Sequence, residues 1–581
     1  MRLVVPGHGA SRGSALGRAR VRQPHALDVV EERIPAAQVE DELARLHAAI
    51  DTVREEMRGL RKRLQGALAQ EIGEFLDLHA LLLDDPELLQ GLDTLIRGGR
   101  YSADYALRVQ RDRIAGVFTG MDDAYLRSRI DDIDQVIGRI HAALHRRSAD
   151  VRGIAGEILV ADNVAPAELA QLQAQGVLAV VTASGSPLSH NAILARSLHL
   201  PLVVGAAQAL QKINDGDVLV VDGGTGLVVR DPDAADLRAH RARVREGKRE
   251  RRELNRLRRE PSRTLDGFDV KLWANAESRE DVAEAHALGA AGVGLYRTEF
   301  LFLGRRELPD EEEQFRAYRD LVLGMTGRTV TVRTLDVGAD KADSSGLALA
   351  DEPNPALGVR GVRLSLRRQE VFETQLRAIV RASAYGPLRV LVPMVACREE
   401  MVAVRALLAR IAADMRAAGH AVADDIPLGA MIEVPSAALA LAGFIDTVDF
   451  ISVGTNDLVQ YLLAADRDNE ALGTLYSPLH PAVLRLLREI IVVAQRRGRS
   501  VAVCGELAAD PAFVPLLLAL GLGELSMHPT MLLEVRQAIR ACDLAALRKR
   551  APALLRARDR AGILRWLESA SPAVTTRSSA R

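Results

Sequence analysis

The stretch around His190 contains residues that could carry a phosphoryl group. A valine-rich run at 177–181 predicts a buried strand, and the small residues 184–187 predict the turn after it. Apolar residues at 193–198 then have the spacing of one helix face, with Ser189 as N-cap and His190 in the first turn. Unpaired N–H groups at a helix N-terminus favour a bound anion. His190 is therefore a candidate phosphate acceptor, although a histidine that merely happens to lie near a helix start fits this local pattern equally well.

A second group of polar side chains follows predicted strands in the C-terminal half. These strand ends are Asn275, Arg297-Thr-Glu299, Arg333-Thr-Leu-Asp336, Glu433, Asn456-Asp457 and Cys504-Gly-Glu506. In a barrel of parallel strands such ends meet at one rim, where active sites are built. Any one of these residues could instead form a structural ion pair, but their recurrence at strand ends favours a site.

The chemistry of this group is that of anion and metal binding. Lys341 adds a point charge, while Glu433 and Asp457 could hold a hard divalent cation with room for substrate oxygens and water. Arginine clamps with Mg²⁺ suit phosphoryl transfer, because its transition state is mainly positioned and neutralised. Planar guanidinium forks for phosphate or carboxylate come from Arg297, Arg333, Arg360 and Arg467.

Cys504 is the odd member of the set, and its position leaves three roles open. At a barrel mouth a thiol could be a proton donor, a nucleophile or merely a small buried residue. The chain has three cysteines, Cys397, Cys504 and Cys542, which are too few for a disulfide framework and fit a reducing cytosol.

The segments that must position these residues differ in sequence pattern along the chain. Residues 1–21 are glycine-rich and too short to fold alone, so we expect them to complete a sheet made later. Residues 39–147 contain three or four amphipathic helical runs, which predict an inserted helical bundle. Residues 156–230 alternate short apolar strands with helices. Within them Gly223-Gly-Thr-Gly226 fits a hairpin turn better than a phosphate loop.

From residue 263 onward the pattern predicts a TIM barrel. Buried strands alternate with helical runs over about 300 residues, the size and rhythm of eight β/α units. We expect an eighth strand between residues 335 and 380, with 359–364 as the candidate. The charged segment 231–260 indicates a solvated linker helix rather than a nucleic-acid patch. Seven strands are expected at 271–275, 292–297, 329–333, 389–394, 428–433, 450–455 and 501–504.

Composition excludes several classes of protein. With 581 residues, 48% of them hydrophobic and 26% charged, the chain predicts a globular protein of two to four domains. A net charge of −1 argues against a dedicated nucleic-acid binder. No apolar run is suited to spanning a bilayer, and residues 1–30 lack the apolar core of a secretion signal. We expect a cytoplasmic protein.

Seven sequence blocks resemble Enzyme I of the bacterial phosphoenolpyruvate:sugar phosphotransferase system, over about residues 7–563. The blocks are Ser189-His190 with Ala195-Arg196; Gly294-Leu-Tyr-Arg-Thr-Glu-Phe-Leu-Phe302; Val332-Arg-Thr-Leu-Asp336 with Asp340-Lys341; Asn354-Pro-Ala-Leu-Gly-Val-Arg360; Ile432-Glu433; Gly454-Thr-Asn-Asp-Leu458; and Cys504-Gly-Glu-Leu507. Seven blocks in the family's order are far more specific than one motif.

The resemblance implies a role for each site residue. His190 is phosphorylated on Nε2 and passes the group to a histidine of the carrier HPr. Residues 122–140 resemble the helix that contacts this carrier. Glu433 and Asp457 ligate Mg²⁺, and Cys504 protonates the enolate to give pyruvate. Phosphoenolpyruvate is bound by Arg297, Arg333, Asn456, Asp457 and Arg467, with Arg360 and Lys341 as further substrate-binding residues.

It also implies a multidomain α/β fold and a homodimer formed through the barrel. The expected parts are a swivelling phosphohistidine α/β domain (1–27 and 148–230), an inserted helical HPr-binding domain (28–147), a linker helix (231–260), a phosphoenolpyruvate-binding TIM (β/α)8 barrel (261–570) and a disordered tail (571–581). Partners other than the substrate and carrier, such as nucleic acid or membrane, are not expected.

The stretch Gly185-Ser186-Pro187-Leu188 departs from the family's Gly-Gly-x-Thr before Ser-His. Its Gly-Ser opening resembles the nitrogen-regulatory branch of Enzyme I, although no sensory domain is predicted at the N-terminus. A regulatory phosphorelay that is not coupled to sugar uptake is therefore an alternative. A dikinase-like enzyme fits less well, because the helical insert is too short for a nucleotide-binding domain.

Overall fold

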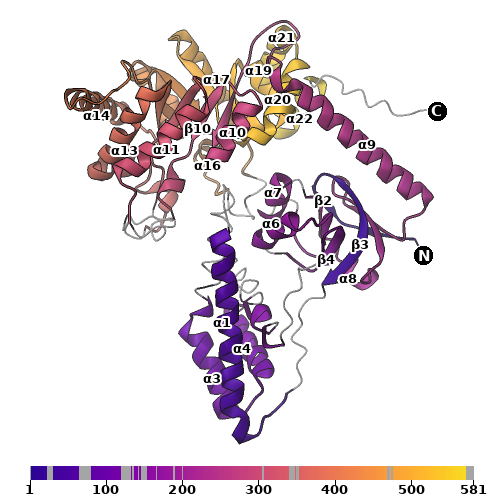
Figure 1. Cartoon of the computed structure of the whole chain (residues 1–581). Coiled ribbons are helices and arrows are strands. Elements are labelled where there is room, and N and C mark those ends of the chain that lie inside the picture. Colours follow the sequence, from indigo (N-terminus) through magenta and orange to yellow (C-terminus); the bar gives the residue numbers. More distant parts are fainter. Residues whose placement is uncertain are drawn as a thin grey trace. The chain divides into compact units, whose positions relative to one another are not determined.

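The computed structural model describes residues 2–22, 31–63, 80, 82–119, 133, 136–141, 143–145, 154–164, 166–186, 190–198, 200–303, 307–338, 347, 352–467, 472 and 475–570. These form two compact units, Met1–Glu250 and Arg251–Arg581 (Figure 1). Lys341, most of the expected carrier-contacting segment 122–140, Pro187-Leu188-Ser189 and the tail 571–581 lie outside the described residues.

The first unit contains an eight-stranded mixed sheet among its described residues, in the order β1-β8-β7-β3-β4-β5-β6-β2. As expected, the glycine-rich start of the chain completes this sheet. Its three strands pair with β8, with β6, and with β4 and β7, respectively. The strands are β1 (Leu3–Pro6), β2 (His8–Ser11), β3 (Ser14–Arg22), β4 (Glu157–Ala161), β5 (Ala179–Thr182), β6 (Leu202–Val204), β7 (Val218–Asp222) and β8 (Leu227–Arg230).

Both faces of this sheet are buried, which explains its continuous apolar strands. In β4, Ile158 and Val160 join one core cluster, while Leu159 and Ala161 join another on the opposite face. The second cluster includes residues of α7 (His190–Ser197) and α6 (Pro166–Ala174), and α8 (Ala209–Lys212) contributes to the first. The turn between β7 and β8 is the hairpin expected from its glycines, since the two strands pair antiparallel from Asp222 and Leu227.

The described residues between 36 and 144 are mainly helical. The helices are α1 (Val39–Arg63), α3 (Pro86–Gly99) and α4 (Ala103–Thr119), followed by helical residues within 133–144. Apolar residues of all these segments, such as Leu46, Leu92, Leu107 and Ile137, share one buried core. The amphipathic runs of the sequence therefore pack as a helical bundle.

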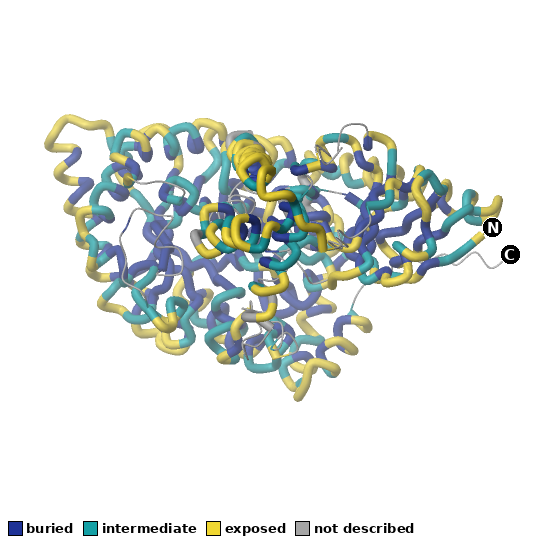
Figure 2. Tube along the Cα trace, turned by 90° about the horizontal axis from the view of Figure 1, so that it is seen from below, coloured by how far each residue is buried: buried dark blue, intermediate teal, exposed yellow. Residues whose placement is uncertain are grey.

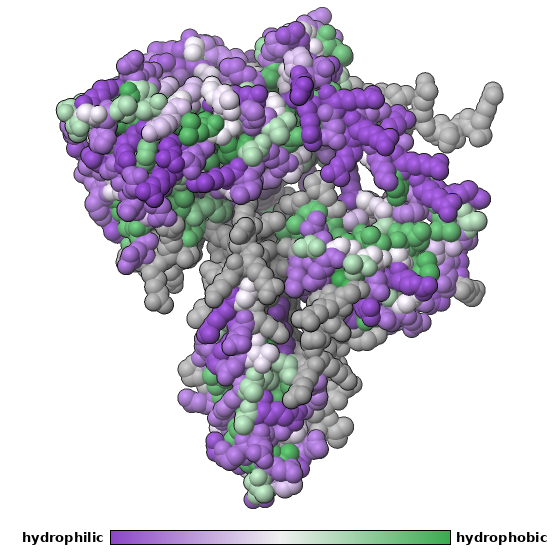
Figure 3. Space-filling model, in the orientation of Figure 1, coloured by the Kyte–Doolittle hydropathy of each residue, from purple (hydrophilic) through white to green (hydrophobic). Residues whose placement is uncertain are grey.

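A long helix, α9 (Ala234–Arg256), and a short 3₁₀ turn (Leu257–Arg259) occupy the charged segment that the sequence assigned to a linker helix. Its side chains are mainly hydrophilic, and only His240 is buried (Figure 3). His240 Nδ1 lies 2.8 Å from Ser14 Oγ on β3. Among the described helices of the chain, none combines the length and apolar character that crossing a membrane requires.

The second unit contains a closed barrel of eight parallel strands. Figure 2 colours the chain by burial, with buried residues in dark blue. The strands are β9 (Lys271–Ala276), β10 (Gly292–Tyr296), β11 (Thr329–Arg333), β12 (Leu388–Val392), β13 (Leu428–Ile432), β14 (Phe450–Val453), β15 (Ser500–Val503) and β16 (Glu524–Met527). The surrounding helices are α10 (Arg279–Ala287), α11 (Glu311–Gly324), α12 (Val362–Arg367), α13 (Gln369–Ala382), α14 (Arg398–Ala417), α15 (Pro435–Phe444), α16 (Thr455–Leu463), α17 (Pro481–Arg496), α18 (Glu506–Ala509), α19 (Val514–Leu520), α20 (Leu532–Arg540), α21 (Leu544–Leu555) and α22 (Arg560–Ala570).

The barrel is the predicted fold, but the predicted position of one strand is wrong. Residues 359–364 do not form the eighth strand: Gly361, at φ +56°, precedes helix α12. The barrel is closed instead by β16, which pairs with β15 and β9. Only four residues long and close to Gly521 and Gly523, β16 gives a weak strand pattern.

Arg536 on α20 connects the beginning of the second unit to the barrel through hydrogen bonds. Its side chain is buried and donates hydrogen bonds to the carbonyls of Leu257, Arg258, Leu288 and Gly289. A single guanidinium group thus satisfies carbonyls from two separate segments, where α9 ends and where α10 leads into β10.

Replacing Arg536 with Met should destabilise this unit by about 3 kcal/mol, because the buried carbonyls lose their donors. Urea unfolding followed by tryptophan fluorescence measures this, since both tryptophans, Trp273 and Trp566, lie in the unit. Arg540→Met is the matched control: Arg540 bonds the Pro261 carbonyl at an exposed position, and its loss should cost less than about 1 kcal/mol. Equal effects of the two variants would contradict the role of Arg536.

Candidate active site

The carboxyl ends of the barrel strands bring together the charged residues that the sequence placed there. Arg333 ends β11, Glu433 follows β13, and Asp457 lies in the first turn of α16 after β14. Arg360 comes from the segment between β11 and α12. Because these groups are largely buried, their charges must be balanced by one another or by a ligand.

Asp336 links the two buried arginines. Its carboxylate accepts two hydrogen bonds from Arg360, at 3.2 and 3.0 Å, and lies 3.3 Å from Nη1 of Arg333. Arg333 also pairs with Glu299 at 3.0 Å. Burial alone would lower the pKa of both arginines, but the neighbouring carboxylates outweigh it and raise both pKa values. Both guanidinium groups therefore stay charged. The Nε atom of Arg333 has no hydrogen-bond partner among the described residues.

Glu433 is almost fully buried and faces other carboxylates. Burial is the main cause that raises its pKa, and the charges of Asp457 and Asp336 raise it further against the opposing effect of Arg333. One carboxylate oxygen accepts a 2.6 Å hydrogen bond from the N–H of Met394, which has a left-handed backbone at φ +58°. A non-glycine residue in this conformation holds its N–H toward Glu433 at an energetic cost, as is typical of functional sites.

The oxygens of Glu433 and Asp457 fit a hard divalent cation. Asp457 Oδ1 is buried and has no hydrogen-bond partner in the described part of the chain. Its nearest cations, Nη1 of Arg360 and of Arg467, are each 3.9 Å away, beyond hydrogen-bond distance. A cation would occupy this unpaired oxygen and relieve the charge repulsion at Glu433, and carboxylate oxygens are the ligands that Mg²⁺ prefers.

Cys504 lies directly after β15, inside the barrel mouth. Its thiol is buried against Leu295, Leu391 and Met431, and Sγ lies 3.5 Å from the Val453 carbonyl. Burial raises the pKa of the thiol to about 11, so it remains protonated at neutral pH. The backbone carbonyl of Cys504 accepts a 3.0 Å hydrogen bond from Asn275 at the end of β9.

Three predicted residues lie at the more exposed edge of this group. Arg297 pairs with Glu277, and Arg467 approaches Asp457 as described above. Asn456 contacts the start of α18: its Oδ1 accepts a 3.1 Å hydrogen bond from the N–H of Glu506. The arginine side chains are each 42% exposed, so both can reach a ligand from solvent.

His190 belongs to the first unit, where it is the first residue of α7, in the first helical turn as predicted. Backbone groups at this position are those that favour an anion. Ser186 is exposed, and residues 187–189, which separate it from His190, lie outside the described residues. His190 and the charged barrel rim are thus parts of two different compact units.

Sequence reasoning did not identify all the residues that organise this rim. Asp336 was noted at a strand end but not as the bridge between two arginines. Tyr461 was missed: its hydroxyl lies 3.4 Å from Arg360 Nη1 and donates to the Ala356 carbonyl at 2.5 Å. It stands one helical turn after Asp457 on α16, a spacing that would have pointed to the same rim.

Comparisons with known families match three successive stretches of the chain. Residues 6–129 match the family described as PEP-utilising enzyme, N-terminal, and residues 153–226 match the PEP-utilising enzyme, mobile domain. Residues 251–544, about half of the chain, match the PEP-utilising enzyme, PEP-binding domain. The described charged rim lies within the last of these, and His190 lies within the mobile domain.

Relatives extend over nearly the whole chain. Phosphoenolpyruvate-protein phosphotransferase of Cupriavidus necator is 45% identical over 93% of this chain and 94% of its own length. The protein of the same name from Geobacillus stearothermophilus is 40% identical over 91% and 92%. A solved structure of "Enzyme I (nEIt)" has 28% identity and a TM-score of 0.36, covering 42% of this chain and 99% of that one. On the strength of the two full-length relatives, the chain belongs to the phosphoenolpyruvate-protein phosphotransferase family.

Proposed function

We propose that this protein transfers the phosphoryl group of phosphoenolpyruvate to His190, releases pyruvate, and passes the group on to a histidine of an HPr-type phosphocarrier. The observation that carries the proposal is the barrel rim, where the carboxyl ends of the strands gather two largely buried arginines, Arg333 and Arg360, with buried carboxylates and the buried thiol of Cys504. Such a site binds a small anion through charge, holds a metal and can donate a proton.

The arginines act as the anion clamp in this proposal. Arg333 and Arg360 are fixed by Asp336, so their remaining N–H donors are held in position before the substrate arrives. Phosphate and carboxylate groups of phosphoenolpyruvate are bound by these two residues with Arg297, Arg467, Asn456, Asp457 and Lys341.

Glu433 and Asp457 are the residues that would hold Mg²⁺. When bound, the metal supplies positive charge that stabilises the phosphate and the enolate formed as the phosphoryl group leaves. Asp336 stays engaged with Arg333 and Arg360 and keeps these two cations oriented toward the substrate.

Cys504 completes the reaction as the proton donor. The bond between phosphorus and the bridging oxygen of phosphoenolpyruvate breaks, the phosphoryl group bonds to Nε2 of His190, and an enolate is left. The Sγ–H proton then moves to the methylene carbon of the enolate, which gives the methyl group of pyruvate. The thiolate left behind recovers its proton from solvent.

The separation of the two reacting parts requires a movement. We infer a phosphohistidine domain (1–27 and 148–230) that swivels about residues 229–260 between the barrel (261–570) and a helical carrier-binding domain (28–147). The barrel is expected to form the homodimer. In the cytoplasm the relay serves either sugar uptake or nitrogen-type regulation, and a transfer panel with both classes of carrier protein distinguishes these two routes.

The test of the proposed function is phosphoryl transfer from labelled phosphoenolpyruvate to purified HPr in the presence of Mg²⁺. The full-length protein should label HPr, and His190→Ala should abolish labelling because the acceptor nitrogen is gone. His420→Ala, which changes an exposed histidine of α14's trailing loop, should transfer at the unchanged rate. Labelling of HPr by His190→Ala would contradict the proposal.

Replacing Cys504 with Ala should slow pyruvate release by about 10²- to 10⁴-fold, the range expected for loss of a general acid. Affinity for phosphoenolpyruvate, measured by calorimetry, should change little, because the thiol acts on the enolate. Cys542→Ala is a matched control: it removes a second buried thiol whose pKa is also raised to about 11, located between α20 and α21. If both variants release pyruvate at similar rates, Cys504 is not the proton donor.

A further inference from the structure

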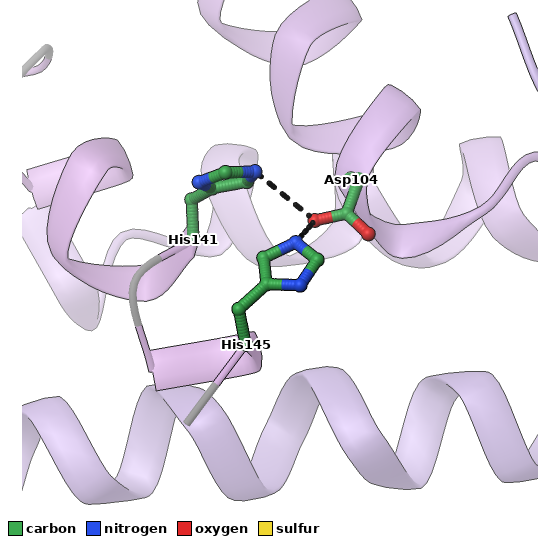
Figure 4. Close-up of side chains that lie close together, drawn as sticks. All are labelled: Asp104, His141 and His145. Atoms are coloured by element: carbon green, nitrogen blue, oxygen red, sulfur yellow. Dashed lines mark hydrogen bonds and ion pairs between the residues drawn. The ribbon is translucent and has the colours of Figure 1, made fainter. Parts of the chain in front are cut away.

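A cluster of metal-binding side chains lies in the helical part of the first unit. Asp104, His141 and His145 bring one carboxylate oxygen and two imidazole nitrogens within 4.8 Å of one another. Figure 4 shows that both imidazole rings point their Nε2 atoms at the same oxygen of Asp104. No part of the proposed phosphoryl transfer uses these residues.

The fold explains why the two histidines face the same carboxylate. His141 and His145 are four residues apart, so they lie on one face of the helical segment that ends the bundle. Val136, Ile137 and Ile140 of the same segment are buried in the bundle core, and the histidines lie at the edge of this apolar stripe. Asp104 lies in the first turn of α4 and reaches the histidines from a different helix.

The distances already approach those of a metal site. Asp104 Oδ1 is 2.8 Å from Nε2 of His145 and 3.3 Å from Nε2 of His141. Ligand atoms around a tetrahedral Zn²⁺, at about 2.0–2.1 Å from the ion, are separated from one another by roughly 3.3 Å. Small side-chain rotations would therefore place all three atoms around one ion.

The second oxygen of Asp104 is held by a supporting ion pair. Arg45 of α1 contacts Oδ2 at 3.3 Å and is itself paired with Glu42 at 3.0 Å. Glu42 also accepts a 2.8 Å hydrogen bond from the N–H of Ala103. This chain of contacts orients Asp104 so that Oδ1 faces the imidazoles, and the charge of Arg45 is offset by Glu42, which leaves the negative charge of Asp104 for a cation.

We propose that Asp104, His141 and His145 form a site for a borderline divalent metal ion, of which Zn²⁺ is the best fit. Two imidazole nitrogens and one carboxylate oxygen are a ligand set typical of Zn²⁺ and leave a fourth position for water. His145 is 40% exposed, which gives the ion a path from solvent. Binding at Nε2 requires only that each ring carry its proton on Nδ1, so neutral imidazoles suffice.

A metal ion here joins two helices that are far apart in sequence. It links the beginning of α4 to the helical segment described within residues 133–144, so bound metal should raise the thermal stability of the helical part. None of its ligands is among the residues assigned to the phosphoryl-transfer steps, although all three lie in the domain proposed to bind the carrier.

The test is Zn²⁺ and Co²⁺ titration of the full-length protein with excess Mg²⁺ present, so that hard oxygen sites are already filled. The native chain should bind one equivalent more than the His141→Gln/His145→Gln variant, with a Co²⁺ visible absorption band that the variant lacks. Zn²⁺ should also raise the melting temperature of the native chain by more than that of the variant. Far-UV circular dichroism verifies that the variant keeps its helices.

His47→Gln is the matched control, because His47 also pairs with an aspartate, Asp93, at 2.9 Å but has no second histidine beside it in the described bundle. This variant should keep the native stoichiometry, absorption band and stabilisation. The proposal is overturned if the double variant binds Zn²⁺ and Co²⁺ as the native chain does, or if His47→Gln loses as much binding as the double variant.

Discussion

The rim of the barrel is organised by charged groups that are largely kept out of water. A buried charge is costly unless it has a partner, and removing one member of a buried pair is more costly still. Asp336 meets this requirement for Arg333 and Arg360 together, with Glu299 as a further partner of Arg333. The result is a rim whose arginines are fixed before any ligand binds.

The negative charges of Glu433 and Asp457 are less well balanced than the positive charges of the arginines. Glu433 and Asp457 have no comparable close cation: Glu433 accepts only a backbone hydrogen bond from Met394 among the contacts described, and the nearest arginine atoms to Asp457 Oδ1 are 3.9 Å away. Burial, together with repulsion from Asp457 and Asp336, raises the pKa of Glu433. A divalent cation bound to Glu433 and Asp457 would relieve this repulsion and add positive charge beside the arginines of the rim.

Periodic sequence features predicted much of this arrangement, whereas features set by distant contacts were not predictable. Strands buried on all sides have apolar runs, so the rim residues could be identified by their position after such runs, as with Arg333 and Cys504. Strand β16 was missed because its four residues, which lie close to glycines, show only a weak strand pattern. Residues 359–364 were wrongly chosen as the eighth strand. The bridging role of Asp336 and the contact of Tyr461 with Arg360 depend on pairings between separate segments, which spacing alone does not give. The same applies to Asp104 and His141, which are 37 residues apart in the chain.

The burial of Cys504 bears on which of its three possible roles is chemically reasonable. A nucleophilic cysteine needs a thiolate, and such residues usually have a pKa lowered by nearby positive charge. Here the apolar wall of Leu295, Leu391 and Met431 has the opposite effect, and the pKa rises to about 11. A thiol with this pKa is protonated at neutral pH, as the proposed role of proton donor requires. The burial that disfavours a nucleophilic thiolate at Cys504 therefore supports its proposed role as a proton donor.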